Sequence, residues 1–186
     1  MNDLDRSRMN PFASVSRQTF DEAERQGFPA FVGPVRESSP VNATPYLIRY
    51  EDFRTRAAHW PERNELAAAL DRVKSHAERL SLVIDAIVIG GSFTELLKPS
   101  PKDVDCLMLY RRPGLVEATP ANALNELQRS AKEERVDVRF IPIDGDPLIL
   151  IKCLCYFTVL LSKDKRAKGN WDVRVIRGLM LLDCRS

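Results

Sequence analysis

Residues 88–110 constrain the fold most, because they join two apolar runs through a glycine-serine turn and a proline-containing loop. The second apolar run carries Asp103 and Asp105 at alternate positions. Since side chains alternate along a strand, both carboxylates are predicted to lie on one face of a sheet. Two like charges at this separation repel each other unless a cation lies between them, so the pair indicates half of a divalent metal site.

The apolar periodicity predicts a single α+β domain with an appended segment. A chain of 186 residues with 44% hydrophobic content is long enough to bury a core. We predict an α/β mixed sheet flanked by helices, with an N-terminal helical extension at residues 1–45 and the main domain at residues 46–186. The predicted helices span residues 16–26, 61–80, 91–97, 119–131 and 148–162, and the predicted strands span residues 82–89, 103–110 and 136–143. The segment at 46–50 is a short strand or an extended anchor, and residues 171–184 are strand-like.

Composition argues against several classes of protein. The formal net charge is only +2, which gives no overall electrostatic case for a nucleic-acid partner. No apolar stretch is long enough for a membrane span and the N-terminus lacks a signal-like core, so we expect a cytoplasmic protein without membrane contact. The cysteines lie in apolar segments and form no C-x-x-C pair, which favours reduced, buried thiols over zinc or disulfides: Cys106, Cys153, Cys155 and Cys184.

A third carboxylate follows on the next predicted strand. Asp137 comes after one crossover helix, and it would stand beside Asp103 and Asp105 if the two strands are neighbours. Three carboxylates at the mouth of a sheet would bind two Mg²⁺ ions, with open positions left for water and phosphate. Such a site suits phosphoryl or nucleotidyl transfer. The alternative is that Asp103 caps a strand and Asp137 faces solvent.

The turn before these carboxylates is typical of phosphate binding. Gly90 and Gly91 would let backbone N–H groups approach a phosphate, and the N-terminus of the following helix adds partial positive charge. The hydroxyl of Ser92 would then reach the terminal phosphates. The alternative for Ser92 is an N-cap serine that only starts a helix.

The arrangement Gly90-Gly91-Ser92, then a spacer, then Asp103-x-Asp105 resembles the signature of the DNA polymerase beta-type nucleotidyltransferase superfamily. Asp137 matches the third carboxylate of that superfamily. Within it, three features are similar to small bacterial nucleotidyltransferase-like proteins, some of which accompany toxins: the Gly-Gly-Ser-Phe form of the turn, Tyr46-Leu47, and Arg166-x-Lys168-Gly169.

The resemblance implies a metal-dependent nucleotidyltransferase. It would move a nucleoside monophosphate from an NTP such as ATP to a hydroxyl acceptor on RNA or tRNA, a protein or a small molecule, and release pyrophosphate. Asp103 and Asp105 would ligate two Mg²⁺ ions, or Mn²⁺ in their place, and Asp137 would ligate the catalytic metal and act as or near the general base. Gly90, Gly91 and Ser92 would hold the triphosphate.

Other features leave two interpretations open. The basic residues at 163–168, with Lys168 as the candidate, and the loop lysines Lys98 and Lys102 would contact triphosphate or RNA, or else form a solvated charged surface. We interpret the aromatic side chains as core rather than as base-stacking platforms: Trp60, Trp171, Tyr156 and Phe157. The rival function is a catalytically quiet binding protein, such as an antitoxin-like partner of a toxin. Its interface would be formed by the N-terminal forty or so residues and the apolar helix from Leu148, which is predicted to be buried.

Overall fold

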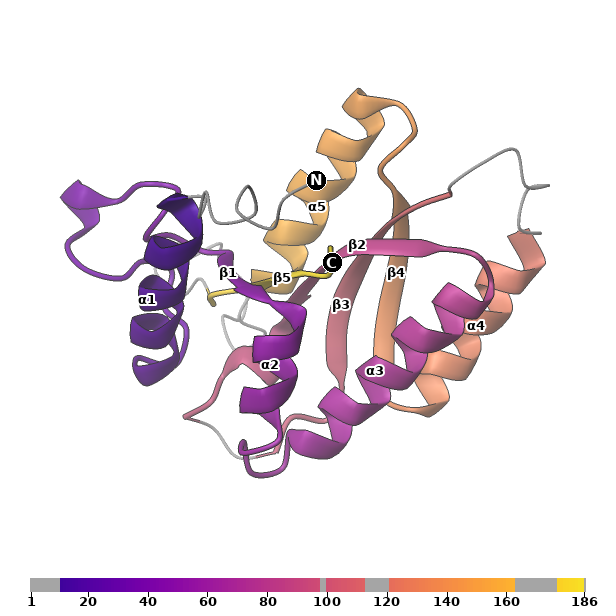
Figure 1. Cartoon of the computed structure of the whole chain (residues 1–186), viewed down its shortest axis with the longest axis horizontal. Helices are drawn as coiled ribbons and strands as arrows, with labels where there is room; N and C mark the ends of the chain where they lie inside the picture. The colour runs from indigo at the N-terminus through magenta and orange to yellow at the C-terminus, as the bar shows by residue number, and fades with distance from the viewer. Residues whose placement is uncertain (1–10, 98–99, 113–120, 163–176, 186) are drawn as a thin grey trace, which may run out of the picture.

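The computed structural model describes residues 11–97, 100–112, 121–162 and 177–185 (Figure 1). A mixed sheet of five strands forms its centre, with the order β1-β5-β2-β3-β4. The strands are β1 (Tyr46–Arg49), β2 (Val83–Gly90), β3 (Val104–Arg111), β4 (Val136–Pro142) and β5 (Met180–Asp183). Strand β1 is parallel to β5 and β3 is parallel to β4, whereas β2 is antiparallel to both of its neighbours. The predicted α+β fold with a mixed sheet flanked by helices is confirmed.

The helices follow the predicted periodicity with shifted ends. They are α1 (Pro11–Arg25), α2 (Tyr50–Ala57), α3 (Asn64–Arg79), α4 (Ala121–Glu133) and α5 (Pro147–Ser162), with short 3-10 helices η2 (Val35–Glu37) and η3 (Gly91–Thr94). Helix α3 begins three residues later than predicted from Pro61. The reason is Glu62, whose φ of 63° is left-handed and incompatible with a right-handed helix. Residues 171–176 of the predicted C-terminal strand lie outside the described residues.

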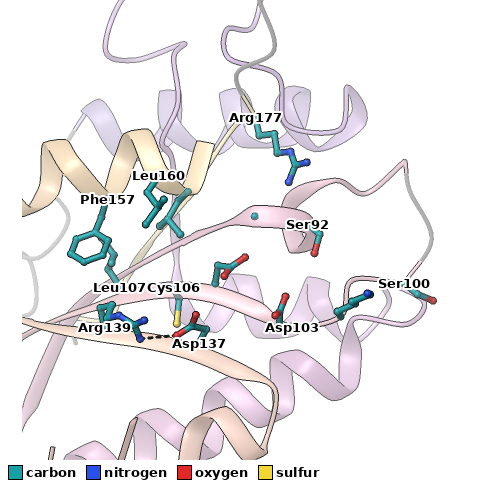
Figure 2. Close-up of a pocket in the computed structure, with 14 residues that line it drawn as sticks. Ser92, Ser100, Asp103, Cys106, Leu107, Asp137, Arg139, Phe157, Leu160 and Arg177 are labelled. Carbon is teal, nitrogen blue, oxygen red and sulfur yellow. Dashed lines mark hydrogen bonds and ion pairs between the residues drawn. The ribbon is translucent and has the colours of Figure 1, made fainter. Parts of the chain in front are cut away.

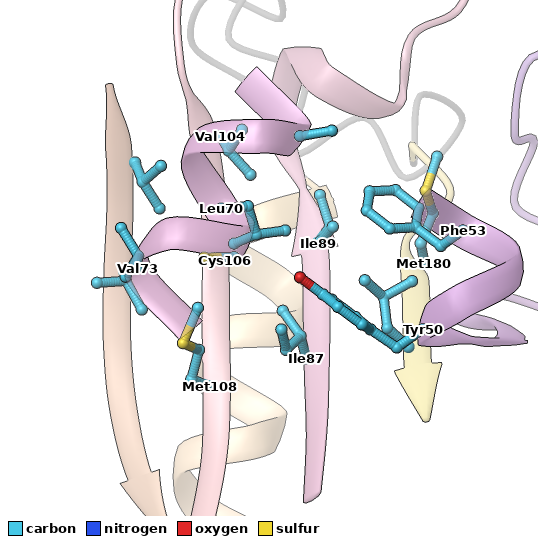
Figure 3. Packing of buried hydrophobic residues seen from close by; sticks show 14 of the residues in the cluster. Tyr50, Phe53, Leu70, Val73, Ile87, Ile89, Val104, Cys106, Met108 and Met180 are labelled. Carbon is cyan, nitrogen blue, oxygen red and sulfur yellow. The ribbon is translucent and has the colours of Figure 1, made fainter. Parts of the chain in front are cut away.

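The main core fills the space between one face of the sheet and helices α1 to α4. Alternate residues of β2 and β3 point into it, among them Ile87, Ile89 and Met108, and all three are fully buried. Leu70 of α3 and Phe53 of α2 belong to the same cluster and pack on this face of the sheet (Figure 3). This apolar layer fixes the register of β2 and β3, because a slip of one residue would turn every core side chain to the opposite face.

Helix α5 lies on the opposite face, where a smaller cluster forms around Val88, Leu107 and Ile141 of the sheet and Leu161 of the helix. The prediction that α5 is buried is wrong. Its outer side is exposed along the whole helix, at Leu148, Ile149, Ile151, Tyr156, Val159 and Leu160. The helix contacts the sheet along one stripe only, and apolar content alone could not reveal how many sides are covered.

Cys155 is exposed on α5, so the prediction that the cysteines are buried is wrong at this position. All four cysteines are free, and Cys106 is buried.

Within the described parts of the chain, no helix is both long and apolar enough to cross a membrane.

Candidate functional site

A cavity of about 610 Å³ opens where β2 ends and β3 and β4 begin, on the face of the sheet that carries α5. We call it the carboxylate pocket. Five predicted site residues line it: Gly91, Ser92, Asp103, Asp105 and Asp137. Its cationic side chains are Lys102, Arg139 and Arg177, and its apolar wall comes from α5 with Phe157, Leu160 and Leu161 (Figure 2).

Strand pairing brings the predicted residues together. Asp105 of β3 lies directly beside Asp137 of the parallel strand β4, and on its other side it pairs with Gly90 at the end of β2. The condition that the two carboxylate strands be neighbours is therefore met. Because the pairing is in register, one row across three strands contains the glycine turn and two carboxylates, and Asp103 lies two residues before Asp105, just ahead of β3.

The two glycines of the turn are required by close approach. Gly91 has a φ of 67°, and a Cβ built on it would lie 2.1 Å from Oδ2 of Asp105. At Gly90, a Cβ would lie 2.6 Å from Leu179 and 2.7 Å from Leu161. The turn can therefore lie against Asp105 on one side and against the end of α5 on the other only without side chains at both positions.

Two arginines hold the turn and the residues that follow it in place. Arg63 is only 4% exposed, and it donates from Nε to the carbonyl of Phe93 at 2.9 Å and from Nη2 to the carbonyl of Glu95 at 2.7 Å. Arg177 pairs with the carboxylate of Glu95 at 2.5 Å, and both side chains are nearly buried. These contacts tie the turn to the start of α3 and to the segment before β5, so its shape is set by the tertiary structure.

The local structure of the turn differs from the prediction. Instead of a helix over residues 91–97, the chain forms the four-residue 3-10 helix η3, whose cap position is Gly90 without any side-chain cap bond. Ser92 lies inside this turn, so the alternative that it serves as an N-cap is wrong. A single turn also has little helix dipole, so what the turn itself offers an anion is its backbone N–H groups and the Ser92 hydroxyl.

The charge in the pocket is partly balanced. Nη1 of Arg139 lies 2.7 Å from Oδ1 of Asp137, and the two side chains are 50% and 39% exposed. Beneath the strands, burial first and then the charges of Asp105 and Asp137 raise the pKa of the Cys106 thiol well above its usual range. The thiol therefore stays protonated, which excludes it as a nucleophile near neutral pH.

The carboxylates of the pocket are ligands of the type that a hard divalent cation prefers. Asp103, Asp105 and Asp137 offer only oxygen ligands beside an open cavity, as Mg²⁺ requires. Among the described residues, however, no group of three or more Asp, Glu, His or Cys side chains is arranged to hold a metal ion. Mg²⁺ usually binds proteins through one or two carboxylates and completes its shell with water and substrate phosphate.

Sequence reasoning missed several residues of the pocket. Arg139 carries a recognisable signal, since it stands two positions after Asp137 in the same strand and so shares its face. Arg177 and the α5 wall carry none, because only the tertiary structure brings them to the pocket. Lys168 and Lys98 lie outside the described residues, whereas Lys102 lines the pocket as an exposed side chain.

Comparison with known proteins shows the family of the chain. A family model described as a family of unknown function (DUF6932) matches residues 29–174, and the chain belongs to this family. The matched range includes every candidate site residue from Gly90 to Lys168 and the whole of α5. No curated protein and no solved structure matches the chain.

Proposed function

We propose that this DUF6932 protein is a metal-dependent nucleotidyltransferase that transfers a nucleoside monophosphate from an NTP to a hydroxyl acceptor. One observation carries the proposal: the in-register row of Gly90, Asp105 and Asp137 across β2, β3 and β4. This row supports a single site in which a phosphate-binding turn and paired carboxylates act on the same ligand.

In this proposal the turn binds phosphate, and the carboxylates hold the cation and accept a proton. The backbone N–H groups at Gly91 and the hydroxyl of Ser92 bind the outer phosphates. Asp103 and Asp105, with Asp137 beside them, would hold Mg²⁺, which when bound neutralises charge on the phosphate oxygens. Asp137 accepts the proton of the acceptor hydroxyl, whose oxygen bonds to the α-phosphorus while the bond to the β-phosphate breaks and pyrophosphate leaves.

In the same proposal, Arg139 pairs with Asp137 in the free protein and binds phosphate when the ligand is present. In the ligand-free protein it neutralises Asp137 through their ion pair at 2.7 Å. A half-exposed pair of this kind stabilises the fold by only about 0–1 kcal/mol, so it is easily exchanged. Because the pair with Asp137 is weak, the Arg139 guanidinium is available within the pocket to bind phosphate oxygens, while Asp137 would help to hold a divalent cation.

Thermal unfolding tests the binding half of the proposal. Mg²⁺ together with an NTP at about a hundred times its Kd is expected to add about 2.7 kcal/mol of stability, which corresponds to a Tm increase of roughly 5–10 °C for a chain of this size. The increase should need both components and should be lost in Asp105→Asn. An equal increase in that variant would show that the ligand binds elsewhere.

A second function is favoured by a different observation, the exposed apolar side of α5. Four exposed large hydrophobic side chains of α5 line neither the carboxylate pocket nor a second cavity beside β4, and exposed apolar patches of this kind mark protein interaction sites: Leu148, Ile151, Tyr156 and Val159. In this alternative the protein is a catalytically quiet binding partner, for example of a toxin, and the pocket is a remnant. The absence of any Mg²⁺-dependent NTP effect on the Tm of the wild-type protein would favour it.

A further inference from the structure

The carboxylate pocket has an apolar wall that the transfer chemistry does not use. Leu160 and Leu161 of α5 line it together with Phe157, opposite the charged strand ends. Figure 2 shows Phe157 and Leu160 projecting from α5 toward the strand of Asp137 and Arg139, with Ser92 and Asp103 at the other end of the pocket. Metal and triphosphate need polar groups, so this wall faces a different part of the ligand.

This wall also borders a second cavity. A second hollow of about 220 Å³ lies along the edge strand β4, and Phe157 and Arg139 line both spaces. Ile149, Leu150 and Cys153 of α5 form one side of the hollow, and Gln128 of α4 contributes an amide. A ligand that extends from the aspartates past Phe157 therefore enters a mostly apolar space, whose polar lining side chains are Gln128, Arg139 and Asp146.

The side chains at this junction have the properties of a stacking platform. Phe157 is only partly buried, and its ring is held edge-to-face by Tyr156 at 5.1 Å between centroids. Arg139 lines the same junction, but its guanidinium pairs with Asp137 and is assigned to the phosphates, so Phe157 is the stacking surface. Aromatic rings are surfaces on which proteins stack nucleobases, and an amide can hydrogen-bond a base edge.

We propose that the nucleobase of the donor NTP stacks on Phe157 at the entrance to the β4 hollow, while its triphosphate lies at the aspartates. This inference rests on the proposed function and names the part of the substrate that α5 recognises. Phe157 also packs against the smaller cluster around Leu107 and Leu161, so its interpretation as a core residue holds in part. Stacking accepts any base, so selectivity among bases falls to the β4 hollow and Gln128.

The test compares ligands with and without a base. The four ribonucleoside triphosphates and inorganic triphosphate are titrated by calorimetry, each with Mg²⁺, into the full chain. The variants are Phe157→Leu, which keeps apolar volume and removes the ring, Phe157→Trp, which restores a ring, and Val159→Ala. Val159 is the matched control, since it lies 52% exposed on the same helix and lines neither space.

Phe157→Leu is expected to weaken NTP binding roughly tenfold and to leave inorganic triphosphate unchanged. Phe157→Trp should restore NTP affinity, and Val159→Ala should change nothing. If the wild-type protein binds NTP no more tightly than triphosphate, or if Phe157→Leu weakens neither or both equally, the inference is overturned while the proposed function stands. If the wild-type protein binds none of these ligands, both fail.

Discussion

Replacement of Asp105 by Asn is expected to lower nucleotidyl transfer about a thousandfold without unfolding the protein. Asp105 stands at the centre of the row that joins β2, β3 and β4, and it lies against the turn at Gly91. Asn keeps the shape but removes the charge that would hold the cation. Losing a few kcal/mol of charge stabilisation in the transition state corresponds to this factor, and steady-state transfer rates measure it directly.

The matched control is Asp144→Asn. Asp144 is exposed beyond the far end of β4, where its carboxylate accepts a hydrogen bond from the backbone N–H of Arg112 at 2.9 Å. Asn keeps that acceptor, so the variant should retain both stability and transfer. Equal losses in Asp105→Asn and Asp144→Asn would contradict a specific role for Asp105.

Gly91→Ala is expected to reduce transfer at least a hundredfold and to destabilise the fold by about 1–3 kcal/mol. The left-handed backbone costs an alanine roughly 1–2 kcal/mol. The added Cβ would also overlap with Oδ2 of Asp105, at 2.1 Å, and must push the carboxylate away. A displacement of about 1 Å at a reacting group can alone cost a hundredfold in rate. Chemical denaturation and transfer rates together report both effects.

Gly33→Ala separates the two causes. Gly33 has a φ of 90°, but a Cβ there meets nothing within 4 Å. Gly33→Ala places an alanine in a left-handed backbone conformation but brings its Cβ near no other atom. The variant should therefore be less stable than the wild-type protein and have the same transfer rate. If Gly91→Ala retains full activity, the close packing of the turn on Asp105 has no functional importance.

The arrangement of the aspartates was predictable because strand alternation and strand order fix it. The two-residue spacing of Asp103 and Asp105 sets their shared face, and a single crossover helix before Asp137 makes β3 and β4 parallel neighbours. Both inferences use local periodicity and a short connection. The site chemistry assigned to these residues stays a prediction, since the family match carries no activity.

The features that escaped prediction depend on contacts between distant segments. Arg63 folds the turn into η3 through the carbonyls of Phe93 and Glu95, so a stretch that favours a helix over 91–97 becomes one 3-10 turn. The exposure of α5 depends on how much of the helix the sheet covers. The apolar composition of the helix does not predict this coverage. The same tertiary placement makes Phe157 part of the pocket wall in addition to packing it against the smaller core cluster.

The position of the transferred label distinguishes nucleotidyl transfer from phosphoryl transfer. The wild-type protein is incubated with Mg²⁺ and NTPs that carry ³²P at the α- or the γ-phosphate, together with RNA, tRNA, protein and small-molecule acceptors. We expect the α-label to become attached to an acceptor while the γ-label leaves as pyrophosphate, and both signals to require Mg²⁺. Transfer of the γ-label to an acceptor, or no Mg²⁺-dependent consumption of any NTP across these acceptors, would contradict the proposed nucleotidyl transfer.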